Sequence, residues 1–245
     1  MSVRVKTVLL LAGTAEARAL AAAFEHPNAR IIASLAGVTA RPLPYPCATR
    51  SGGFGGVEGL RTYLVREGVD ALVDATHPFA TQMSGHAVAA SSAAHLPLLR
   101  LIRPPWPHEG HWQSFATLPE AIAALPTGAR VLATTGRKDI AHWTHRADIE
   151  VLLRSVDPVD APPRHIVTIT GRGPFSCEEE IALMRAHRIT HLVTRNSGGD
   201  SRARLDAAKA LALPVHSIER PPQSAVNVVH TVADALHWIS DVLGD

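Results

Sequence analysis

Short apolar runs rich in β-branched residues alternate with longer stretches of helical periodicity along nearly the whole chain. Strands are expected at Val8–Ala12, Arg30–Ser34, Ala71–Asp74, Leu98–Leu101, Val131–Thr134, Ile166–Thr170, His191–Thr194 and Val215–Ile218. Helices are expected at Ala15–Phe24, Val57–Arg66, Ala80–Ala94, Pro119–Leu125, Glu178–His187, Ala203–Leu211 and Thr231–Val242. Repeated strand–helix–strand units predict an α/β protein whose parallel sheets carry helices on both faces.

Three prolines within Arg103–Pro107 interrupt this rhythm, because proline fits neither a helix interior nor a central strand. The alternation restarts on each side of this stretch. The sequence therefore predicts two doubly wound domains, residues 1–104 and 105–245, with a cleft between them. Sheets of this type bind ligands beyond the carboxyl ends of their strands, so functional side chains are expected there.

The composition narrows the possible functions. A chain of 245 residues fits two domains, and 46% hydrophobic against 19% charged residues excludes intrinsic disorder. A net charge of only +2 argues against nucleic acid as a partner. The apolar run Thr7–Ala12 meets Gly13 too early for a signal peptide, and no run approaches the roughly 18 residues of a membrane span. A soluble protein without a membrane partner is expected.

Cysteine and histidine positions argue against disulfides and metal sites. Cys47 and Cys177 are too few and too far apart for a disulfide framework, and they have no metal-type spacing. Histidines three residues apart occur at His108–His111 and His142–His145, but neither pair has a third ligand nearby. We therefore expect no metal and a reducing, cytoplasmic compartment.

Gly13 and Thr14 follow the first predicted strand and open the first predicted helix. Glycine allows the backbone to approach a phosphate closely, and the helix N-terminus attracts its negative charge. The spacing differs from the G-x-G-x-x-G fingerprint of dinucleotide sites. A tight turn with Thr14 as the helix N-cap fits equally well, so both interpretations stay open here.

The second predicted strand is followed by hydroxyl and guanidinium groups, at Ser34, Thr39 and Arg41, and by no acidic residue. Enzymes that use NAD usually place an acid there for the ribose, whereas selection of the 2′-phosphate needs hydroxyl or guanidinium groups. A dinucleotide ligand would therefore be the phosphorylated form. The alternative is that Arg41 is a solvated loop residue.

Two further strand ends in the first half carry candidate ligand groups. Phe54 lies between two glycine pairs in Gly52–Gly56, directly before a predicted helix, which favours a ligand-binding loop over a flexible linker. Asp74, Thr76 and His77 follow the third predicted strand, and His77 is a candidate proton donor. Alternatively, Asp74 shapes the turn by accepting backbone hydrogen bonds, and Pro78 opens the next helix.

In the second half, three predicted strand ends combine glycine with cationic or amide groups, at residues 135–138, 171–175 and 195–199. Guanidinium, ammonium and amide donors on one sheet edge suit a ligand with several carboxylates or phosphates. A solvated surface is the alternative for any one loop. The sequence lacks the G-x-S-x-G and G-x-x-x-x-G-K-[ST] motifs, which argues against serine hydrolases and P-loop NTPases.

Taken in order, seven of these motifs resemble those of the precorrin-6A reductases of cobalamin (vitamin B12) biosynthesis. They are Leu11–Arg18, Ser34–Gly37, Gly52–Gly56, Asp74–Ala80, Arg103–Trp106, Gly173–Phe175 and Asn196–Gly199. The resemblance implies two Rossmann-like domains and reduction of one C=C bond of a tetrapyrrole, precorrin-6A to precorrin-6B, with NADPH as hydride source. It also allows channelling between neighbouring enzymes of the pathway.

The resemblance assigns roles by position. The cofactor would be bound by Gly13, Thr14, Glu16, Arg18, Ser34, Gly37, Thr39, Arg41, Gly53, Phe54, Gly55 and Gly56. Asp74, Thr76 and His77 would lie near the nicotinamide, and the substrate would contact Phe79, Lys138, Gly173, Phe175, Arg195, Asn196 and Ser197. Arg195 and Arg204 stand where lysines are common in the family, which keeps the charge but changes the hydrogen-bond geometry.

Hydride transfer must be followed by proton transfer, and we expect His77, or water held by Thr76 or Asp74, to supply the proton. Two other functions remain as alternatives. An S-adenosylmethionine-dependent methyltransferase shares the opening strand and glycine turn but usually has an acid after the second strand. A non-catalytic module for nucleotides or tetrapyrroles would keep the loops without turnover. Oxidation of NADPH in the presence of precorrin-6A separates the three.

Overall fold

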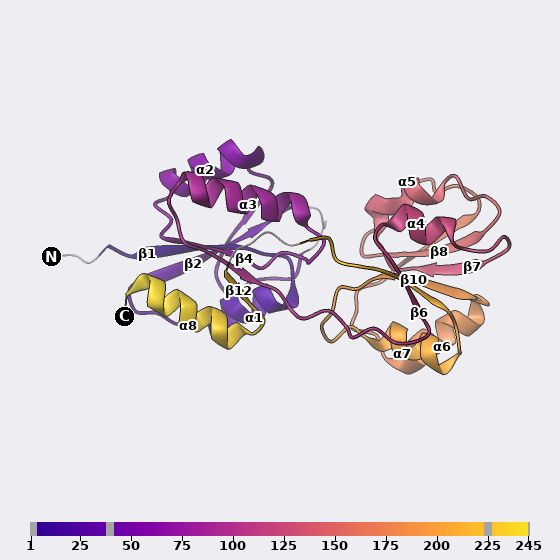
Figure 1. Cartoon of the computed structure of the whole chain (residues 1–245). Coiled ribbons are helices and arrows are strands. Elements are labelled where there is room, and N and C mark those ends of the chain that lie inside the picture. The colour runs from indigo at the N-terminus through magenta and orange to yellow at the C-terminus, as the bar shows by residue number, and fades with distance from the viewer. Residues whose placement is uncertain (1–3, 38–41, 223–226, 245) are drawn as a thin grey trace. The chain divides into compact units, whose positions relative to one another are not determined.

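The computed structural model describes residues 4–37, 42–222 and 227–244. Two compact units make up the chain, one formed by Met1–Pro104 with Pro222–Asp245 and the other by Pro105–Pro221 (Figure 1). The predicted second domain, 105–245, is therefore too long at its C-terminal end. Residues after Pro221 return to the first unit, where strand β12 pairs with β5 and helix α8 packs into the apolar core.

The first unit contains a sheet of six described strands, all paired in parallel, in the order β12-β5-β4-β1-β2-β3. Helices α1 and α8 pack on one face and α2 and α3 on the other (Figure 1). The strands are β1 Lys6–Leu11, β2 Ala29–Leu35, β3 Ala48–Ser51, β4 Ala71–Asp74, β5 Leu98–Leu101 and β12 Asn227–Val229. The helices are α1 Ala15–Ala23, α2 Gly56–Arg66, α3 Thr81–Ala93 and α8 Val232–Leu243.

Strand β1 shows why these runs are apolar on both faces. Val8 and Leu10 belong to the core cluster that includes α1 and α8, whereas Leu9 and Leu11 belong to the cluster that includes α2 and α3. Successive side chains of a strand point to opposite faces, so the middle of a central strand covered by helices on both sides is apolar at consecutive positions.

The second unit contains six described strands, again all parallel, in the order β6-β11-β10-β7-β8-β9. Helices α4 and α5 lie on one face, and α6 and α7 on the other (Figure 1). The strands are β6 Trp112–Phe115, β7 Arg130–Ala133, β8 Glu150–Ser155, β9 Ile166–Thr170, β10 His191–Arg195 and β11 Val215–Ile218. The helices are α4 Leu118–Ala123, the 3₁₀ turn η1 Arg137–Asp139, α5 Ile140–Trp143, α6 Cys177–Ala186 and α7 Ala203–Ala210.

The predicted class, two doubly wound α/β units with parallel sheets, is confirmed. Written from the opposite edge, the two orders are β3-β2-β1-β4-β5-β12 and β9-β8-β7-β10-β11-β6, so both sheets follow one plan. The order reverses between β1 and β4 in the first unit and between β7 and β10 in the second. Doubly wound sheets bind ligands at such switch points.

The eight predicted strands and seven predicted helices all exist, and four strands agree with the structure to the residue: β4, β5, β9 and β11. Strands β3, β6, β8 and β12 were not predicted, nor was the short α5. Helix α3 begins at Thr81, so Pro78 belongs to the preceding turn and does not open the helix.

The chain passes between the units twice, each time within the sequence Arg-Pro-Pro, at 103–105 and 220–222. Each arginine is anchored within its own unit. Arg103 pairs with Glu16 of α1 at 2.8 Å, and Arg220 donates to the carbonyl oxygens of Asn196 and Ser197 at 3.0 and 2.8 Å. Proline restricts the backbone at both crossings.

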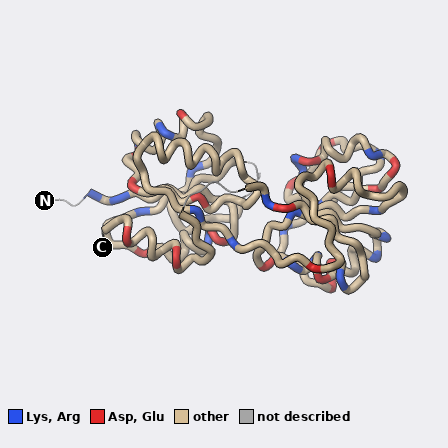
Figure 2. The backbone as a smooth tube through the Cα atoms, in the orientation of Figure 1, with Lys and Arg blue, Asp and Glu red and all other residues tan. Residues whose placement is uncertain are grey.

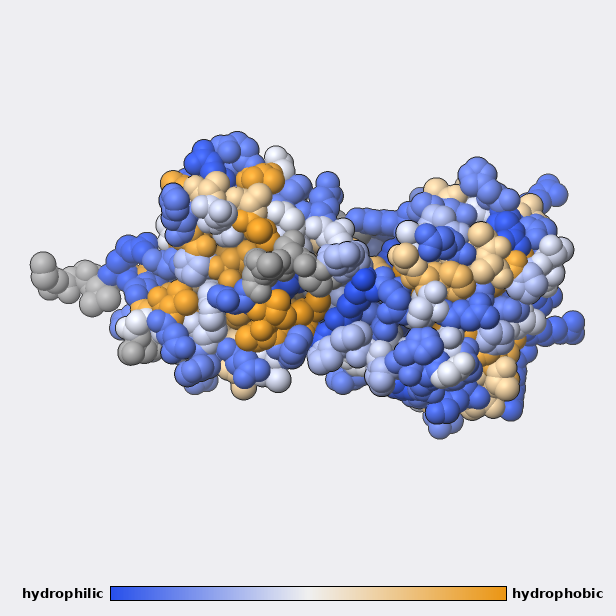
Figure 3. Space-filling model, viewed as in Figure 1, coloured by the Kyte–Doolittle hydropathy of each residue, from blue (hydrophilic) through white to orange (hydrophobic). Residues whose placement is uncertain are grey.

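Charged residues of both signs are interspersed along both units (Figure 2). The most exposed large apolar side chains are Val5, Leu43, Val65, Val156, Val167 and Val228, which lie on different segments, and the viewed surface mixes hydrophilic and hydrophobic residues (Figure 3). Within residues 4–37, 42–222 and 227–244, every helix is too short or too polar to cross a membrane.

Candidate functional site

The turn from β1 into α1 is held by Thr14. Its hydroxyl accepts a hydrogen bond from the Ala17 N–H at 3.1 Å and donates one to the Ala75 carbonyl at 2.8 Å. The N-cap interpretation of Thr14 is therefore confirmed. The second bond ties the turn after β1 to the residue that follows β4, so Thr14 fixes both sides of the switch point.

Gly13 adopts a φ of +131°, which side-chain-bearing residues avoid, although an added Cβ would have no heavy atom within 4 Å. Its N–H donates to the Tyr45 hydroxyl at 3.2 Å, and the Arg18 guanidinium lies over the Tyr45 ring at 5.3 Å. Tyr45 was not predicted. The other charged residue of this helix turn, Glu16, forms the ion pair with Arg103.

Arg50, which was not predicted, organises the loop that follows β3. Its guanidinium donates to the Ser34 hydroxyl at 2.7 Å and to the carbonyls of Gly52 and Gly53 at 3.0 and 3.2 Å. Its charge also lies 4.0 Å from the centre of the Phe54 ring, a cation–π contact. The arginine thus joins the predicted end of β2 to the predicted glycine loop.

Positive φ values of +84° and +87° at Gly55 and Gly56 turn the chain into α2, where only glycine fits comfortably. Gly37 also has a positive φ, and an added Cβ there would lie 3.3 Å from the Ser51 hydroxyl oxygen. The structure therefore brings Ser34, Gly37 and the Gly52–Gly56 loop together. Thr39 and Arg41 lie outside the described residues.

The turn after β4 is shaped by Asp74. Its Oδ1 accepts hydrogen bonds from the Thr76 N–H at 3.0 Å and the Thr76 hydroxyl at 2.6 Å. Its Oδ2 lies 3.7 Å from Nε of Arg100, and the two side chains are only 3% and 4% exposed. The structural alternative for Asp74 is confirmed, because this carboxylate is held by the turn and by a buried arginine from β5 that was not predicted.

His77 is half-buried in the same turn, and its Nδ1 accepts a hydrogen bond from the Phe79 N–H at 3.3 Å. A neutral imidazole whose Nδ1 accepts carries its proton on Nε2. The Phe79 ring is also a neighbour, with 5.8 Å between ring centres. Of the predicted catalytic side chains, His77 is the one that carries a ring N–H.

In the second unit, Arg195 joins the ends of the two switch-point strands. It donates to the Thr135 carbonyl at 2.9 Å and to the Asp139 carboxylate at 2.7 Å. Burial raises the pKa of the Asp139 carboxyl, and the Arg195 charge opposes that effect. Lys138, two residues after Gly136, is exposed and has no hydrogen-bond or ion-pair partner within the described part of the chain.

The Asn196 side chain forms hydrogen bonds with both backbone polar groups of Trp106. Its side-chain amide accepts from the Trp106 N–H at 2.8 Å and donates to the Trp106 carbonyl at 3.1 Å, and the side chain is buried. The Trp106 indole N–H donates to the Gly199 carbonyl at 2.8 Å. Two of the sequence motifs therefore pack against each other and hold the start of the second unit. Ser197 is also buried, and its carbonyl accepts from Arg220.

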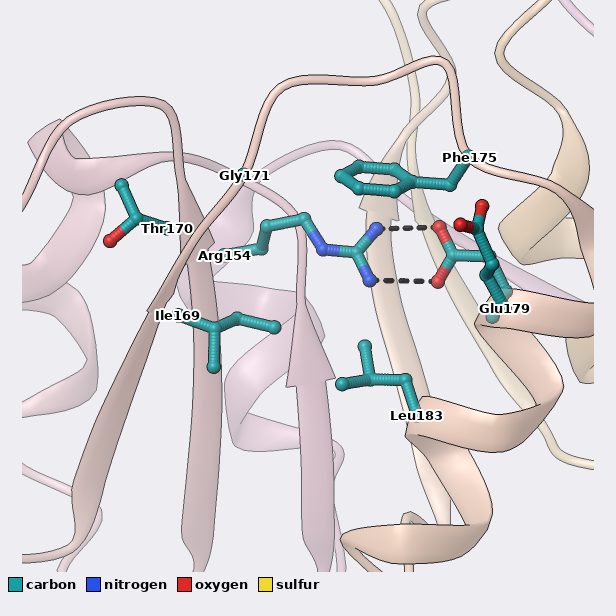
Figure 4. A pocket seen from close by; sticks show the side chains of 8 residues that line it. Arg154, Ile169, Thr170, Gly171, Phe175, Glu179 and Leu183 are labelled. Carbon is teal, nitrogen blue, oxygen red and sulfur yellow. Dashed lines mark hydrogen bonds and ion pairs between the residues drawn. The ribbon is translucent and has the colours of Figure 1, made fainter.

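A cavity of about 260 Å³ lies between helix α6 and the last residues of β8 and β9 (Figure 4). It is lined by Arg154, Ile169, Thr170, Gly171, Phe175, Glu179, Glu180 and Leu183. Arg154 and Glu180 form a bidentate pair at 2.5 and 2.8 Å, and the Phe175 ring lies over the guanidinium, 4.4 Å from ring centre to Cζ. A Cβ at Gly171 would lie 2.9 Å from Cζ of Phe175, so the ring would have to shift to accommodate a larger residue. Of the predicted substrate residues, Phe175 lines this cavity.

Comparison with known proteins places the chain in one family. A profile of "Precorrin-6x reductase CbiJ/CobK" matches residues 7–240. A precorrin-6A reductase from Rhodococcus erythropolis is 44% identical over 95% of this chain and 96% of its own. A cobalt-precorrin-6A reductase from Priestia megaterium is 29% identical over 94% and 96%. The solved structure "CobK precorrin-6A reductase" has a TM-score of 0.90 at 39% identity and covers 97% of each chain. The resemblance inferred from the motifs is confirmed, and the chain belongs to the precorrin-6x reductase family.

Proposed function

We propose that this protein reduces one C=C bond of precorrin-6A to give precorrin-6B in cobalamin biosynthesis, with NADPH as the reductant. The observation that carries the proposal is the family match over residues 7–240. The higher identity to a precorrin-6A reductase, 44%, than to a cobalt-precorrin-6A reductase, 29%, supports a substrate without cobalt. A cytoplasmic location suits such a biosynthetic enzyme, whose two cysteines are free thiols.

The first unit supplies the residues that suit a nicotinamide dinucleotide. The turn at Gly13 and Thr14 opens a helix of nine residues, whose first N–H groups lack intrahelical partners and favour a phosphate. The end of β2 has no acid and offers the Ser34 hydroxyl. The Gly52–Gly56 loop lies beside it, held by Arg50. The bound cofactor would supply the hydride, while these residues hold its phosphates.

The turn after β4 supplies the proton in this proposal. Addition of a hydride to a conjugated C=C bond leaves negative charge that one proton must neutralise. His77 presents an Nε2–H, with its ring oriented by the Phe79 N–H. Asp74 and Thr76 act by positioning, since the Thr76 hydroxyl donates to Asp74 and the Asp74 carboxylate is shared between the turn and Arg100.

The second unit supplies cations for the acetate and propionate arms of the tetrapyrrole. Lys138 is exposed beside the switch point, and an ammonium group there can bind a carboxylate without losing another partner. Arg195 is already paired with Asp139, so its net attraction for a substrate carboxylate is weaker. We therefore expect Lys138 to contribute more to substrate binding than Arg195 does.

Anaerobic incubation of the protein with precorrin-6A and NADPH tests the proposal. The expected result is oxidation of NADPH together with a product heavier by two hydrogen atoms. Methylation of precorrin-6A by S-adenosylmethionine would instead support a methyltransferase. Binding of both ligands without turnover would leave a binding module. NADH that supports the same rate at the same concentration would contradict the choice of NADPH.

A further inference from the structure

Arg50 lies where a doubly wound unit presents the adenosine end of a dinucleotide. In the register of the sheet it stands directly opposite Ser34, at the carboxyl end of β2. This strand end is the position from which such folds contact the ribose. The charge of Arg50 therefore lies at the strand end where, in such folds, the 2′-phosphate that distinguishes NADPH from NADH is bound.

Within the described residues, the Arg50 side chain contacts neutral groups. They are one hydroxyl, two carbonyls and the rings of Phe54 and Tyr63, at 4.0 and 5.1 Å from the guanidinium carbon. Guanidinium has five N–H donors, and these contacts use two on Nη1 and one on Nη2. The Nε–H and one Nη2–H have no partner within residues 4–37, 42–222 and 227–244, and no carboxylate there forms an ion pair with Arg50.

We infer that Arg50 binds the 2′-phosphate of NADPH and is the residue that gives this reductase its coenzyme preference. The inference rests on the proposed function. The contacts to Gly52, Gly53 and Phe54 hold the guanidinium in place before the ligand arrives, so little side-chain entropy is lost on binding. Two remaining N–H groups match the bidentate geometry that arginine uses with phosphate.

A purely structural role would explain the loop contacts of Arg50, but it would assign no function to a charge that has no carboxylate partner within the described residues. Arg154 in the second unit shows the contrast, because it also stacks on a phenylalanine of a glycine-containing loop but is neutralised by Glu180. The bound ligand would complete the ion pairing of Arg50, as Glu180 does for Arg154.

Isothermal titration of the full chain with NADPH and with NADH tests this inference on the unmodified protein, R50Q and R50K. R50Q should weaken NADPH binding by roughly 10- to 100-fold more than NADH binding, which is the value of a charge-assisted hydrogen bond or two. Any loss that comes from loosening the Gly52–Gly56 loop should affect both coenzymes alike. The NADPH affinity of R50K should lie between those of the unmodified protein and R50Q, because lysine keeps the charge but lacks the paired N–H groups of the guanidinium. The matched control is R66Q, since Arg66 contacts the same Tyr63 ring at 5.6 Å but pairs with Glu67.

A titration with nucleotide fragments distinguishes a contact to the 2′-phosphate from a general effect of Arg50 on the loop. The unmodified protein should bind 2′,5′-ADP more tightly than 5′-AMP, and R50Q should bind the two alike. Equal losses of NADPH and NADH affinity in R50Q would overturn the inference and leave Arg50 as a loop-holding residue, as would unchanged NADPH binding. If R50Q does not fold, the R50K ratio and the fragment preference of the unmodified protein decide in the same way. If the unmodified protein binds neither coenzyme, the proposed function itself fails.

Discussion

The two units share one strand order but differ in the chemistry near one edge of each sheet, at Arg50 in β3 and at Arg154 in β8. Each places an arginine against a phenylalanine, Arg50 with Phe54 and Arg154 with Phe175, at 4.0 and 4.4 Å. Arg154 is paired with a carboxylate, whereas Arg50 has hydroxyl and carbonyl partners. The two units thus share a topology but differ in local counter-charge, and on our proposal this difference decides which ligand suits each unit.

The helices that follow the two switch points also differ, in their length. In the first unit the glycine turn leads into α1, nine residues long and capped by Thr14. In the second unit the turn at Gly136 leads into a 3₁₀ turn of three residues and a helix of four. A longer helix aligns more peptide dipoles at its N-terminus, so the first unit offers the better phosphate site. The predictions below test this division of labour.

The largest expected effect is on stability, when the carboxylate that pairs with Arg154 in the second unit is removed. E180Q leaves Arg154, 12% exposed, without its partner, and should lower the free energy of unfolding by roughly 3–5 kcal/mol. Urea denaturation measures the change, with E178Q, on the exposed side of the same helix turn, as control. A loss below about 1 kcal/mol would show that the pair is solvated and that the contrast with Arg50 is overstated.

Matched substitutions of the two switch-point glycines should affect the NADPH affinity differently in the two units. Gly13 and Gly136 have φ values of +131° and +92°, so valine strains both turns. G13V should weaken NADPH binding roughly 10- to 100-fold, because the N–H groups at the start of α1 move. G136V should leave the NADPH affinity within about threefold. Calorimetric titration checks both, and similar losses in the two variants would contradict a cofactor site confined to the first unit.

The smallest expected difference is a loss of folding stability at acid pH that arises from histidines of the second unit. Burial lowers the pKa of His216, whose Nδ1–H donates to the Ala121 carbonyl at 2.8 Å, and burial followed by the His216 charge lowers that of His191. Because their folded-state pKa values lie below 6.5, these histidines contribute stability that is present above pH 6.5 and lost as the pH falls toward the folded values.

The variant H216N keeps an N–H near the position of Nδ1 and removes the titrating ring. Its free energy of unfolding should therefore vary less with pH below 6.5 than that of the unmodified protein. Urea denaturation at several pH values measures the slope. An unchanged slope would assign the acid sensitivity to other groups.

Local features of the site could be predicted from the sequence. The cap at Thr14 depends on one side chain and an N–H three residues later, and the turn at Asp74 on a group two residues later. Long-range partners could not, because they depend on strand register. Arg50 meets Ser34, and Arg100 meets Asp74, only once β2 pairs with β3 and β4 with β5 in the observed alignment.

The fold was predictable where strands are buried on both faces and less so at the edges. Strand β3 is short and largely exposed, and β12 has three residues, so neither shows a strong apolar pattern. Strand β8 does contain the apolar run Val151–Leu153 and was missed despite it. The return of the chain to the first unit had one usable signal, the repeat of Arg-Pro-Pro at Arg220–Pro222.

Hydrogen–deuterium exchange of the full chain, with and without NADP⁺, tests whether the cofactor binds to the first unit, because it reports on both switch points in one experiment. Slower exchange is expected in segments 13–18 and 50–57 on binding, with little change in 134–139 and 171–176. Slower exchange confined to the two segments of the second unit would contradict binding to the first unit.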